Sequence, residues 1–487
     1  MSMDNRTRWL ALIVLCLGDL MIVLDGTIVN VALPSIREDL AFSQASLAWV
    51  VNSYLLTFGG FLLLGGRLGD LFGHRRFFLI GIALFTSASL ACGLADSQNA
   101  LVAARAAQGV GGAVVSAVAL SLIMTLFTEP AERAKAMGVF GFVLSGGGTV
   151  GVLLGGVLTD ALDWHWIFLV NLPVGLAVFA LSLTLLPAGG GRPAAGRLDA
   201  AGAVTVTAAL MLAVYAIVNA NEAGWSSGRT LGLLAVAAVL LGLFLAIEAR
   251  VAAPLMPLRL FRIRDVSSAN LVGVLMAAGM FAQFFFSALY LQRVLGYTPL
   301  EVGLAYIPST VLWGASSLAL SDRLVMRFGV KPPLIAGLVL MATGLALFAR
   351  APVDGSFLTD ILPASLAIGL GAGIAFNPLL LTAMSGVEPS ESGLASGVVN
   401  TAFMMGGALG LAVLASLAAS RTESLASGGG GLSAVNGGYH TAFVGGAVLV
   451  AAATAVGAAL VRASAGTELE GMDAAAPEAA AAAAGCE

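Results

Sequence analysis

The stretch WLALIVLCLGDLMIVLDGTIVNVAL, residues 9–33, decides the fold class of this chain. It is 25 residues long and nearly free of charge, whereas about 20 apolar residues suffice for a helix to cross the hydrocarbon core of a membrane. A second apolar run follows without a small-residue cleavage site, so we interpret the stretch as a retained transmembrane helix and not as a signal peptide. Of the 487 residues, 59% are hydrophobic and only 10% are charged. We therefore predict an integral membrane protein.

Further apolar runs of similar length recur along the chain. They lack the alternation of apolar and polar residues that membrane-spanning barrel strands require, so each run is expected to be a helix. We count fourteen spans, at approximately residues 9–33, 46–66, 77–95, 100–124, 136–159, 166–187, 199–219, 230–248, 267–291, 300–320, 332–349, 358–384, 393–416 and 441–461.

The spans divide into two blocks that share a weak repeat. The segment GGRLGDLFGHRR (residues 65–76) follows the second span and LALSDRLVMRFGVK (residues 318–331) follows the tenth. Duplicated bundles with a site between them are typical of secondary transporters. We therefore predict an all-α integral membrane fold with four parts: a six-helix bundle over residues 9–187, a connector with two inserted helices over 188–266, a second six-helix bundle over 267–461, and a low-complexity tail over 462–487.

The distribution of basic residues predicts which side of the membrane each loop occupies. With fourteen spans, seventeen of the 23 Lys and Arg residues share the side of the termini, five lie on the other side, and Arg105 lies inside a span. Basic residues concentrate in cytoplasmic loops, so we predict that both termini and the tail are cytoplasmic. The Gly- and Ser-rich segment 417–440 is then expected to be an external loop.

Several functional classes lack their sequence signals. There is no GxxxxGK[ST] phosphate loop, which argues against ATP as the energy source. Three scattered histidines and three cysteines without CxxC spacing predict no metal site, and a net charge of −4 without a basic tract predicts no nucleic-acid partner. A membrane-embedded enzyme needs clustered catalytic residues and a channel is more naturally an oligomer of pore helices, so we expect neither. We predict a monomer without a cofactor, embedded in the lipid bilayer.

Asp25 lies near the middle of the first span. A charged side chain there costs about 2.5–3.5 kcal/mol on insertion scales, so it should face a cavity or a partner. Asp19 lies six residues earlier, about 120° around the helix, and the two should not share one site. Burial favours the protonated form of Asp25, whereas proximity to Arg105 in the fourth span favours the carboxylate. A change in their separation would couple a proton to conformation; the alternative is a static buried ion pair that fixes helix packing.

Six motifs together resemble the major facilitator superfamily and, within it, the fourteen-span drug:proton antiporter family. They are LDGTIVNVALP in the first span, GRLGDLFGHRR after the second, RAAQGVGG in the fourth, GVLLGG in the fifth, WHWIFLVNLPVG entering the sixth, and YLQRVLGYTPLEVGLAYIP across the ninth and tenth. The similarity runs from about Trp9 to Val461. It implies the major facilitator fold and a role in proton coupling for Asp25 and Arg105, to which we add Asp19.

The resemblance also implies a latch after the second span that holds the inside-closed state. Its residues are Gly66, Asp70, Gly73, Arg75 and Arg76. Asp70 is expected to cap and pair across the turn, Gly73 to permit a tight backbone, and the arginines to meet acidic groups or helix C-termini. The arginines also fit the general preference for basic residues in cytoplasmic loops, and this role does not exclude the latch.

The fifth span carries the glycines of the antiporter motif. Gly147, Gly151 and Gly155 recur at every fourth position and are followed by Gly156, which predicts a smooth groove for close helix approach. The family usually has a proline after the glycine that corresponds to Gly151, and here Val152 stands there. The proline that would kink the helix at this point is therefore missing, whereas the glycine groove remains intact.

Candidate substrate-pocket residues come from the first, ninth and thirteenth spans. They combine flexible Met and aromatic side chains, which adapt to varied ligands, with amides that should avoid lipid: Asn30, Met276, Met280, Gln283, Phe284, Asn400 and Phe403. The family often has an Arg-Gln pair after the Asn-Thr of the thirteenth span, where this chain has Phe403 and Met404. This replacement favours bulky hydrophobic substrates; the alternative is a plain packing substitution. The Phe residues of the ninth span are equally compatible with contact to lipid.

These features predict a proton-coupled antiporter that exports hydrophobic or cationic drugs or antibiotics across the bacterial cytoplasmic membrane. One charge crossing 100 mV releases about 2.3 kcal/mol, and each tenfold of solute gradient costs about 1.4 kcal/mol, so one or two protons suffice. The alternative is a dedicated exporter of a single endogenous metabolite or antibiotic. The expected partners are a small-molecule substrate and protons, and we do not expect an enzyme.

Overall fold

The computed structural model describes residues 4–43, 45–127, 129–187, 199–251, 254–385, 387, 392–426 and 431–462. The predicted tail, apart from its first residue, and most of the Gly- and Pro-rich start of the connector lie outside these ranges. Within them the regular secondary structure is helical. Thirteen described segments are long and apolar enough to cross a membrane, and the 32-residue helix α5 contains a further apolar stretch, Gly147–Ala161. The predicted fold class is confirmed.

The helices follow one another in three groups. The first bundle contains α1 (Asn5–Asp39), α2 (Ala48–Phe72), α3 (His74–Gly93), α4 (Gln98–Leu126), α5 (Pro130–Ala161), α6 (Trp166–Leu169) and α7 (Asn171–Leu185). The inserted hairpin contains α8 (Ala200–Ala223) and α9 (Gly228–Glu248). The second bundle contains the 3₁₀ turn η1 (Leu258–Arg262), α10 (Arg264–Arg293), α11 (Pro299–Ser316), the π turn η2 (Ser317–Ser321), α12 (Asp322–Phe328), α13 (Lys331–Phe348), the π turn η3 (Phe357–Ile361), α14 (Leu362–Met384), α15 (Ser392–Ala426) and α16 (Gly431–Leu460).

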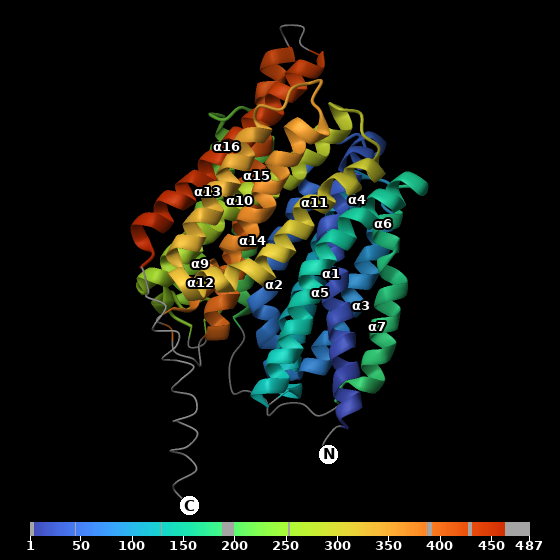
Figure 1. Cartoon of the computed structure of the whole chain (residues 1–487), viewed down its shortest axis with the longest axis vertical. Coiled ribbons are helices and arrows are strands. Elements are labelled where there is room, and N and C mark those ends of the chain that lie inside the picture. Colours follow the sequence, from blue (N-terminus) through green and yellow to red (C-terminus); the bar gives the residue numbers. More distant parts are fainter. Residues whose placement is uncertain are drawn as a thin grey trace, which may run out of the picture.

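Helices of each bundle pack mainly on one another (Figure 1). In the first bundle α4 lies against α2 and α3, and α1 against α5 and α7. In the second bundle α10 lies against α15 and α16, and α13 against α14 and α16. We call the end of the molecule with the α2–α3 turn the inner end, and the end with the α15–α16 connection the outer end.

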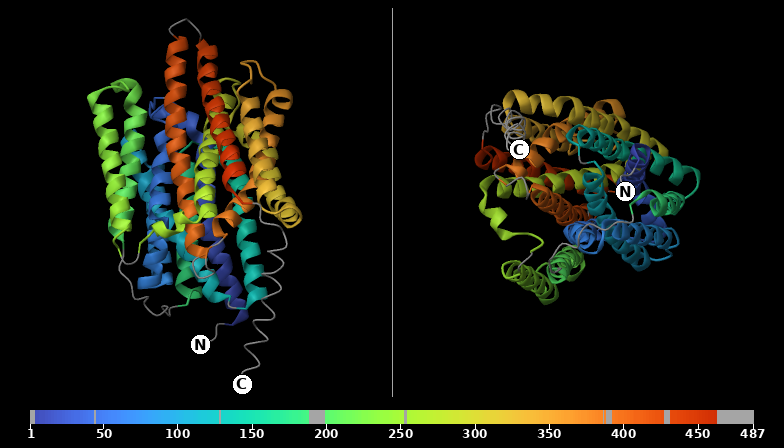
Figure 2. Two further views of the ribbon diagram at one scale, coloured as in Figure 1. Left: turned by 90° about the vertical axis from the view of Figure 1, so that its left-hand side faces the viewer. Right: turned by 90° about the horizontal axis from the view of Figure 1, so that it is seen from below.

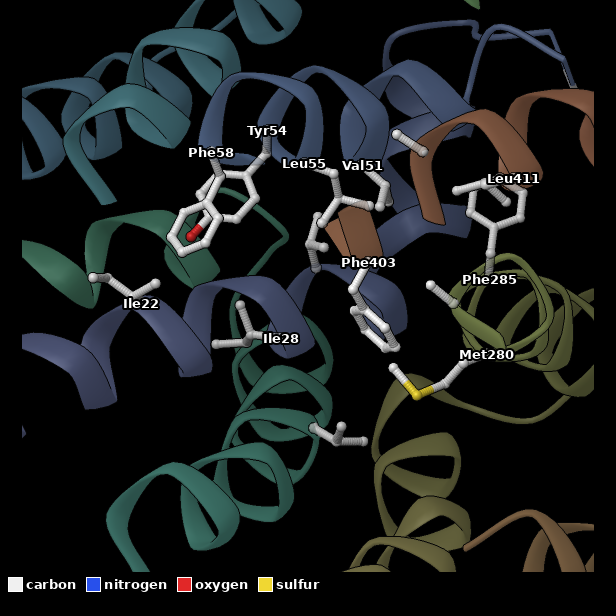
Figure 3. Close-up of a cluster of buried hydrophobic side chains, with 14 of the residues drawn as sticks. Ile22, Ile28, Val51, Tyr54, Leu55, Phe58, Met280, Phe285, Phe403 and Leu411 are labelled. Carbon is white, nitrogen blue, oxygen red and sulfur yellow. The ribbon is translucent and has the colours of Figure 1, made fainter. Parts of the chain in front are cut away.

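Small residues join the two bundles where α5 meets α11 and α2 meets α15. A Cβ atom at Gly156 would lie 2.7 Å from the carbonyl oxygen of Pro299, and one at Gly59 would lie 3.0 Å from the Cβ of Met404. Figure 3 shows the buried apolar side chains at this junction, with Phe403 of α15 between α1 and α10. Close backbone approach therefore fixes the contact between the bundles.

The α8–α9 hairpin lies at the edge of both bundles, as Figure 2 shows. Its helix α8 packs against α2 and α15, one from each bundle. A side chain at Gly60 of α2 would collide with Thr207 of α8, which explains the glycine there. The outer face of α9 is exposed and apolar, with Val239 70% exposed, as expected for a surface that faces lipid.

The expected loop over residues 417–440 is wrong for its described parts, 417–426 and 431–440, which are helical; residues 427–430 lie outside the described residues. Helix α15 continues to Ala426 and α16 begins at Gly431, so both form a hairpin that projects at the outer end (Figure 1). A Cβ atom at Gly438 would lie 2.6 Å from the carbonyl oxygen of Ala418. The small residues in this segment therefore permit tight helix packing where composition had suggested a loop.

Candidate functional site

Asp25 is fully buried in the first bundle and three donors surround its carboxylate. The guanidinium of Arg105 forms an ion pair with Oδ2. The side-chain amides of Gln108 and Asn171 donate hydrogen bonds of 2.7 and 3.1 Å to Oδ1. Asp25 and Arg105 are 0% and 1% exposed. Together these donors stabilise the carboxylate form, because both oxygens have charge-assisted or amide partners.

Four helices bring these groups together. Gln108 lies three residues after Arg105 on the same face of α4, and it accepts a 2.7 Å hydrogen bond from Nη1 of that arginine. It also donates a 2.8 Å bond to the hydroxyl of Ser89 on α3. Asn171 is the first residue of α7, at the break between α6 and α7. We call Asp25, Ser89, Arg105, Gln108 and Asn171 the Asp25 cluster.

Arg105 is held from its other sides by aromatic rings and a backbone carbonyl. Its guanidinium lies 4.4 Å from the ring centroid of Tyr54 and 5.5 Å from that of Phe168. Its Nε donates a 3.0 Å hydrogen bond to the carbonyl oxygen of Val50 in α2. Cation–π contacts and hydrogen bonds offset the desolvation of a buried ion pair. The cluster is thus a closed, fully bonded unit.

Asp19 occupies a different environment six residues earlier on α1. It is 1% exposed, and neither carboxyl oxygen meets the geometry of a full hydrogen bond among the described residues. The hydroxyl of Ser116 on α4 lies near the carboxyl group and interacts favourably with it, and Tyr54 of α2 also lies close. No cation and no amide donor of the described residues faces Asp19 in these contacts, so burial here favours the neutral acid more than it does at Asp25. The predicted separation of Asp19 and Asp25 into two environments agrees with this geometry.

The α2–α3 turn has the tight backbone expected for the latch. Gly73 ends α2 and precedes α3 with φ of +101°, a conformation that disfavours other residues. Arg75 donates a 2.5 Å hydrogen bond to the carbonyl oxygen of Leu183, near the C-terminus of α7. Arg76 is exposed, and the side chain of Asp70 lies outside the described part of the chain. The role of the latch in the transport cycle remains a prediction.

Gly66 is not the glycine that packing requires on α2. A Cβ atom there would make only an ordinary contact of 3.7 Å with Ala117, whereas at Gly65 it would lie 2.9 Å from the Cα of Val114. The close approach of α2 and α4 therefore depends on Gly65, which the sequence analysis did not single out.

The glycines of α5 form the expected groove, and α1 lies in it. A Cβ atom at Gly147 would lie 2.8 Å from Leu20, one at Gly151 would lie 3.0 Å from the carbonyl oxygen of Leu24, and one at Gly155 would lie 2.7 Å from that of Ile28. These contacts bracket Asp25 on α1. Gly156 faces the opposite bundle at α11. The groove thus positions the helix that carries Asp25.

Met280 and Phe403 lie together at the junction of the bundles (Figure 3). The ring of Phe403 lies 6.1 Å from that of Phe281 on α10 and 5.7 Å from that of Phe376 on α14, both edge to face. Aromatic and Met side chains from three helices therefore form one apolar wall. Met276, one turn from Met280 on α10, is fully buried.

Gln283 and Phe284 do not belong to that wall. The Phe284 ring lies 5.6 Å from Tyr306 of α11, and Gln283 donates a 3.2 Å hydrogen bond to the hydroxyl of Ser287. Both residues therefore lie near Tyr306 of α11, and their place in a substrate pocket with Met280 remains a prediction.

The two candidate amides outside α10 lie on α1 and α15. Asn30 donates 3.3 Å hydrogen bonds to the carbonyl oxygens of Gly26 and Thr27 in its own helix. A Cβ atom at Gly26 would meet nothing within 4 Å, so this face of α1 borders open space. Asn400 is half-buried on α15. Both therefore remain candidates for substrate contact.

Comparison with known proteins identifies the family. A sequence model of a protein family, described as Major Facilitator Superfamily, matches residues 15–411 of the chain. The chain belongs to the major facilitator superfamily. The predicted family is thereby confirmed, and with it a multi-pass membrane transporter that acts on small molecules.

Curated relatives within the major facilitator superfamily are named for antibiotic resistance and export. The puromycin resistance protein pur8 of Streptomyces alboniger is 42% identical over 86% of this chain and 83% of its own length. The cephamycin export protein CmcT of Amycolatopsis lactamdurans is 39% identical over 92% and 91% of the two chains. The multidrug resistance protein Stp of Mycobacterium tuberculosis is 38% identical over 85% and 76%.

Solved major facilitator structures share the fold at low sequence identity. A bacterial homolog of the lysosomal transporter Spinster, in an inward-facing and unoccupied conformation, has a TM-score of 0.66 with 17% identity over 93% of this chain and 97% of that one. The nucleoside transporter NupG has a TM-score of 0.65 with 13% identity over 93% and 100% of the two chains. These similarities support the architecture alone.

Three members of the Asp25 cluster in this major facilitator protein were missed from sequence. Gln108 and Asn171 lie within the motifs RAAQGVGG and WHWIFLVNLPVG, where each is a polar side chain in an apolar run. That signal was available, because polar side chains within spans seek partners inside the bundle. Ser89 carries no comparable signal, since serine is common in membrane helices.

Proposed function

We propose that this transporter exports hydrophobic or cationic antibiotic-like molecules across the bacterial cytoplasmic membrane in exchange for protons. The observation that carries the proposal is the buried ion pair between Asp25, in the middle of α1, and Arg105 of α4. Names of the relatives support antibiotics as the substrate class. The inner end is taken as cytoplasmic because most basic residues lie there.

Asp25 is the proposed proton acceptor. A proton from the outer side forms an O–H bond on its carboxyl group and removes the negative charge opposite Arg105. The guanidinium stays protonated, so it becomes a buried cation without a counter-ion. Loss of one partner of a buried ion pair costs roughly 3–5 kcal/mol, enough to favour a different arrangement of α1 and α4. The closed cluster corresponds to the deprotonated state.

Asp19 is the proposed second proton carrier. Its burial, with the hydroxyl of Ser116 as its favourable polar neighbour and no cation beside it in the described part of the chain, favours the protonated form in this conformation. Access to water in another conformation would allow it to ionise, so that it would gain and lose a proton once per cycle.

The apolar wall around Phe403 and Met280 is the proposed substrate contact. Rings from α10, α14 and α15 meet there, and such surfaces bind varied hydrophobic molecules. Asn30 and Asn400 would supply polar contacts.

Transport in proteoliposomes with an imposed pH gradient tests the proposal. We expect the gradient to drive accumulation of puromycin by the wild-type protein and not by Asp25→Asn. The matched control is Asp96→Asn, an exposed aspartate at the outer end of the same bundle. Equal, gradient-independent movement of puromycin and other hydrophobic antibiotics in all three proteins would reject proton antiport.

A dedicated exporter of one antibiotic is the second candidate. It is favoured by relatives whose names specify a single compound, such as the cephamycin export protein and the tetracenomycin C resistance and export protein. Transport assayed with a panel of unrelated antibiotics separates the two functions: export of several classes supports a multidrug transporter, and export of one supports a dedicated carrier.

A further inference from the structure

A cavity separate from the Asp25 cluster lies where the inserted hairpin meets the two bundles. It has a volume of about 440 Å³ and is lined by α2, α8, α9, α10 and α15, with residues of the segment between α9 and α10. Its lining positions fall in the inner halves of these helices. We call it the lateral pocket. The Asp25 cluster lies instead among α1, α3, α4 and α7, so the two sites are separate.

The walls of the lateral pocket are almost entirely apolar. They include Leu210 of α8, Leu241 and Phe244 of α9, and Met405 of α15. A volume of this size is within the ordinary range of about 300–1,000 Å³ for small-molecule sites. Water gains little in such a space, because it finds few hydrogen-bonding partners there.

Two buried polar atoms in the wall lack partners among the described residues. Asn270 and Thr401 are only 5% and 7% exposed, and both line the lateral pocket. The amide nitrogen of Asn270 donates a 2.8 Å hydrogen bond to Val266, which leaves its Oδ1 as an unsatisfied acceptor. The hydroxyl oxygen of Thr401 is also unsatisfied. Buried polar groups are normally satisfied, so these atoms indicate a ligand that donates hydrogen bonds.

The hairpin leaves a route to the pocket from the membrane. Among the described helices, α9 is in extensive contact with α8 alone, whereas α8 is packed against α2 and α15. The pocket wall formed by α9 is therefore held mainly by α8, with a hydrogen bond from the Met256 backbone to Glu248 near its inner end. A displacement of α9 away from α10 would open the cavity to the membrane.

We propose that the lateral pocket binds an amphiphilic small molecule from the inner half of the bilayer, with an apolar body and one or two hydrogen-bond donors. The apolar body fills the space between the hairpin and the bundles. A hydroxyl or amine donates to Asn270 and Thr401. Two sources share this chemistry, a membrane lipid and an export substrate. Binding here does not depend on proton coupling.

Photolabelling of the full-length protein in lipid nanodiscs tests this site. The probe is a long-chain alcohol that carries a diazirine, compared with the matching diazirine alkane, and the adducts are mapped by peptide mass spectrometry. We expect the alcohol to label the pocket-lining segments of α8, α9 and α15. Ala402→Trp, which fills the pocket, should reduce this labelling at least several-fold. Val239→Trp, on the lipid face of α9, is the matched control and should leave it unchanged.

Removal of the two acceptors provides an independent variant that does not alter the volume much. In Asn270→Leu combined with Thr401→Val, labelling by the alcohol should fall to the level of the alkane. Displacement of the alcohol by excess puromycin would identify an export substrate as the occupant, and displacement only by added phospholipid would identify a lipid. Equal alcohol labelling in wild type, the filled variant and the acceptor-free variant, or adducts confined to other segments, would overturn the proposal. Photolabelling requires no transport, so a negative result would reject the lateral pocket without rejecting proton antiport.

Discussion

The two bundles of this major facilitator protein differ in where they hold charge. Among the described residues, the buried charged side chains are Asp19, Asp25 and Arg105 in the first bundle and Asp199 and Glu248 in the inserted hairpin. Buried polar side chains in the second bundle are neutral there, and large aromatic residues such as Phe285 and Phe286 dominate its interior. Buried charge is costly in a membrane protein and is associated with function. This difference supports the proposal that the first bundle handles protons and the second provides apolar contacts to the substrate.

A second contrast lies within the first bundle. Asp25 has a cation and two amides on its carboxylate, whereas the favourable polar neighbour of Asp19 is the hydroxyl of Ser116. The same residue type on the same helix therefore has strong support for the carboxylate at one position and weak support at the other. We therefore expect substitutions of Asp19, of Asp25 and of residues in the second bundle to differ in their effects on stability, proton coupling and substrate binding.

The largest expected effect on stability comes from Arg105→Ala. It leaves the Asp25 carboxylate buried without its cation and should destabilise the protein by roughly 3–5 kcal/mol. Thermal unfolding in detergent measures the change. Arg105→Ala combined with Asp25→Asn should recover part of the loss, because no isolated charge remains. No recovery in the double variant would mean that Arg105 acts through packing on Tyr54 and Phe168 and not through its charge.

Gly151→Val should have the next largest effect. The new side chain would press against the Leu24 backbone in α1, and overpacking of this kind typically costs about 1–3 kcal/mol. Gly148→Val is the matched control on the same helix, since a Cβ atom there makes only a 4.0 Å contact with Thr27. Thermal unfolding of both variants, together with pH-driven transport, measures the difference. Equal losses would show that the groove does not position α1.

Phe403→Ala should alter substrate selection more than coupling. It removes a ring that we propose contacts the substrate, and loss of one such aromatic contact, worth about 0.5–1.5 kcal/mol, should raise the apparent KM for aromatic substrates roughly two- to tenfold. The number of protons moved per substrate should stay as in wild type. A changed proton ratio with an unchanged KM would contradict the assignment of substrate contact to the second bundle.

Asp19→Asn should have the smallest effect on stability. Asparagine resembles a neutral aspartic acid in size, so the free energy of unfolding should change by less than about 1 kcal/mol. Asp25→Asn, the matched substitution, should cost several times more, because it leaves Arg105 without its counter-ion. If Asp19→Asn destabilises the protein as much as Asp25→Asn does, Asp19 is ionised and paired in the folded state.

The sequence predicted the spans because they depend on local composition, and it predicted the pairing of Asp25 with Arg105 because Arg105 is the only basic residue within a predicted span. It did not predict Ser89, which reaches the cluster only through the packing of α3 on α4. Helical periodicity identified the residues that share a face of α10. It could not identify the neighbours of that face, such as Tyr306 of α11 beside Phe284, and the place of Gln283 and Phe284 in a substrate pocket remains a prediction.

Composition misled the prediction for residues 417–440. Glycine and serine favour loops in water, but in helices of a membrane protein the same residues allow close packing. The close approach of Gly438 to Ala418 shows glycine used for helix packing. A loop assignment from glycine content is therefore weaker at the ends of membrane helices than in soluble proteins.

Proton movement driven by substrate tests the central claim most directly. Proteoliposomes loaded with puromycin and a pH-sensitive dye are diluted into puromycin-free buffer, and the dye reports protons that enter as the drug leaves. The account predicts proton entry in the wild-type protein and in Asp96→Asn, and none in Asp25→Asn. Proton entry at the wild-type rate in Asp25→Asn would contradict the assignment of the transported proton to Asp25.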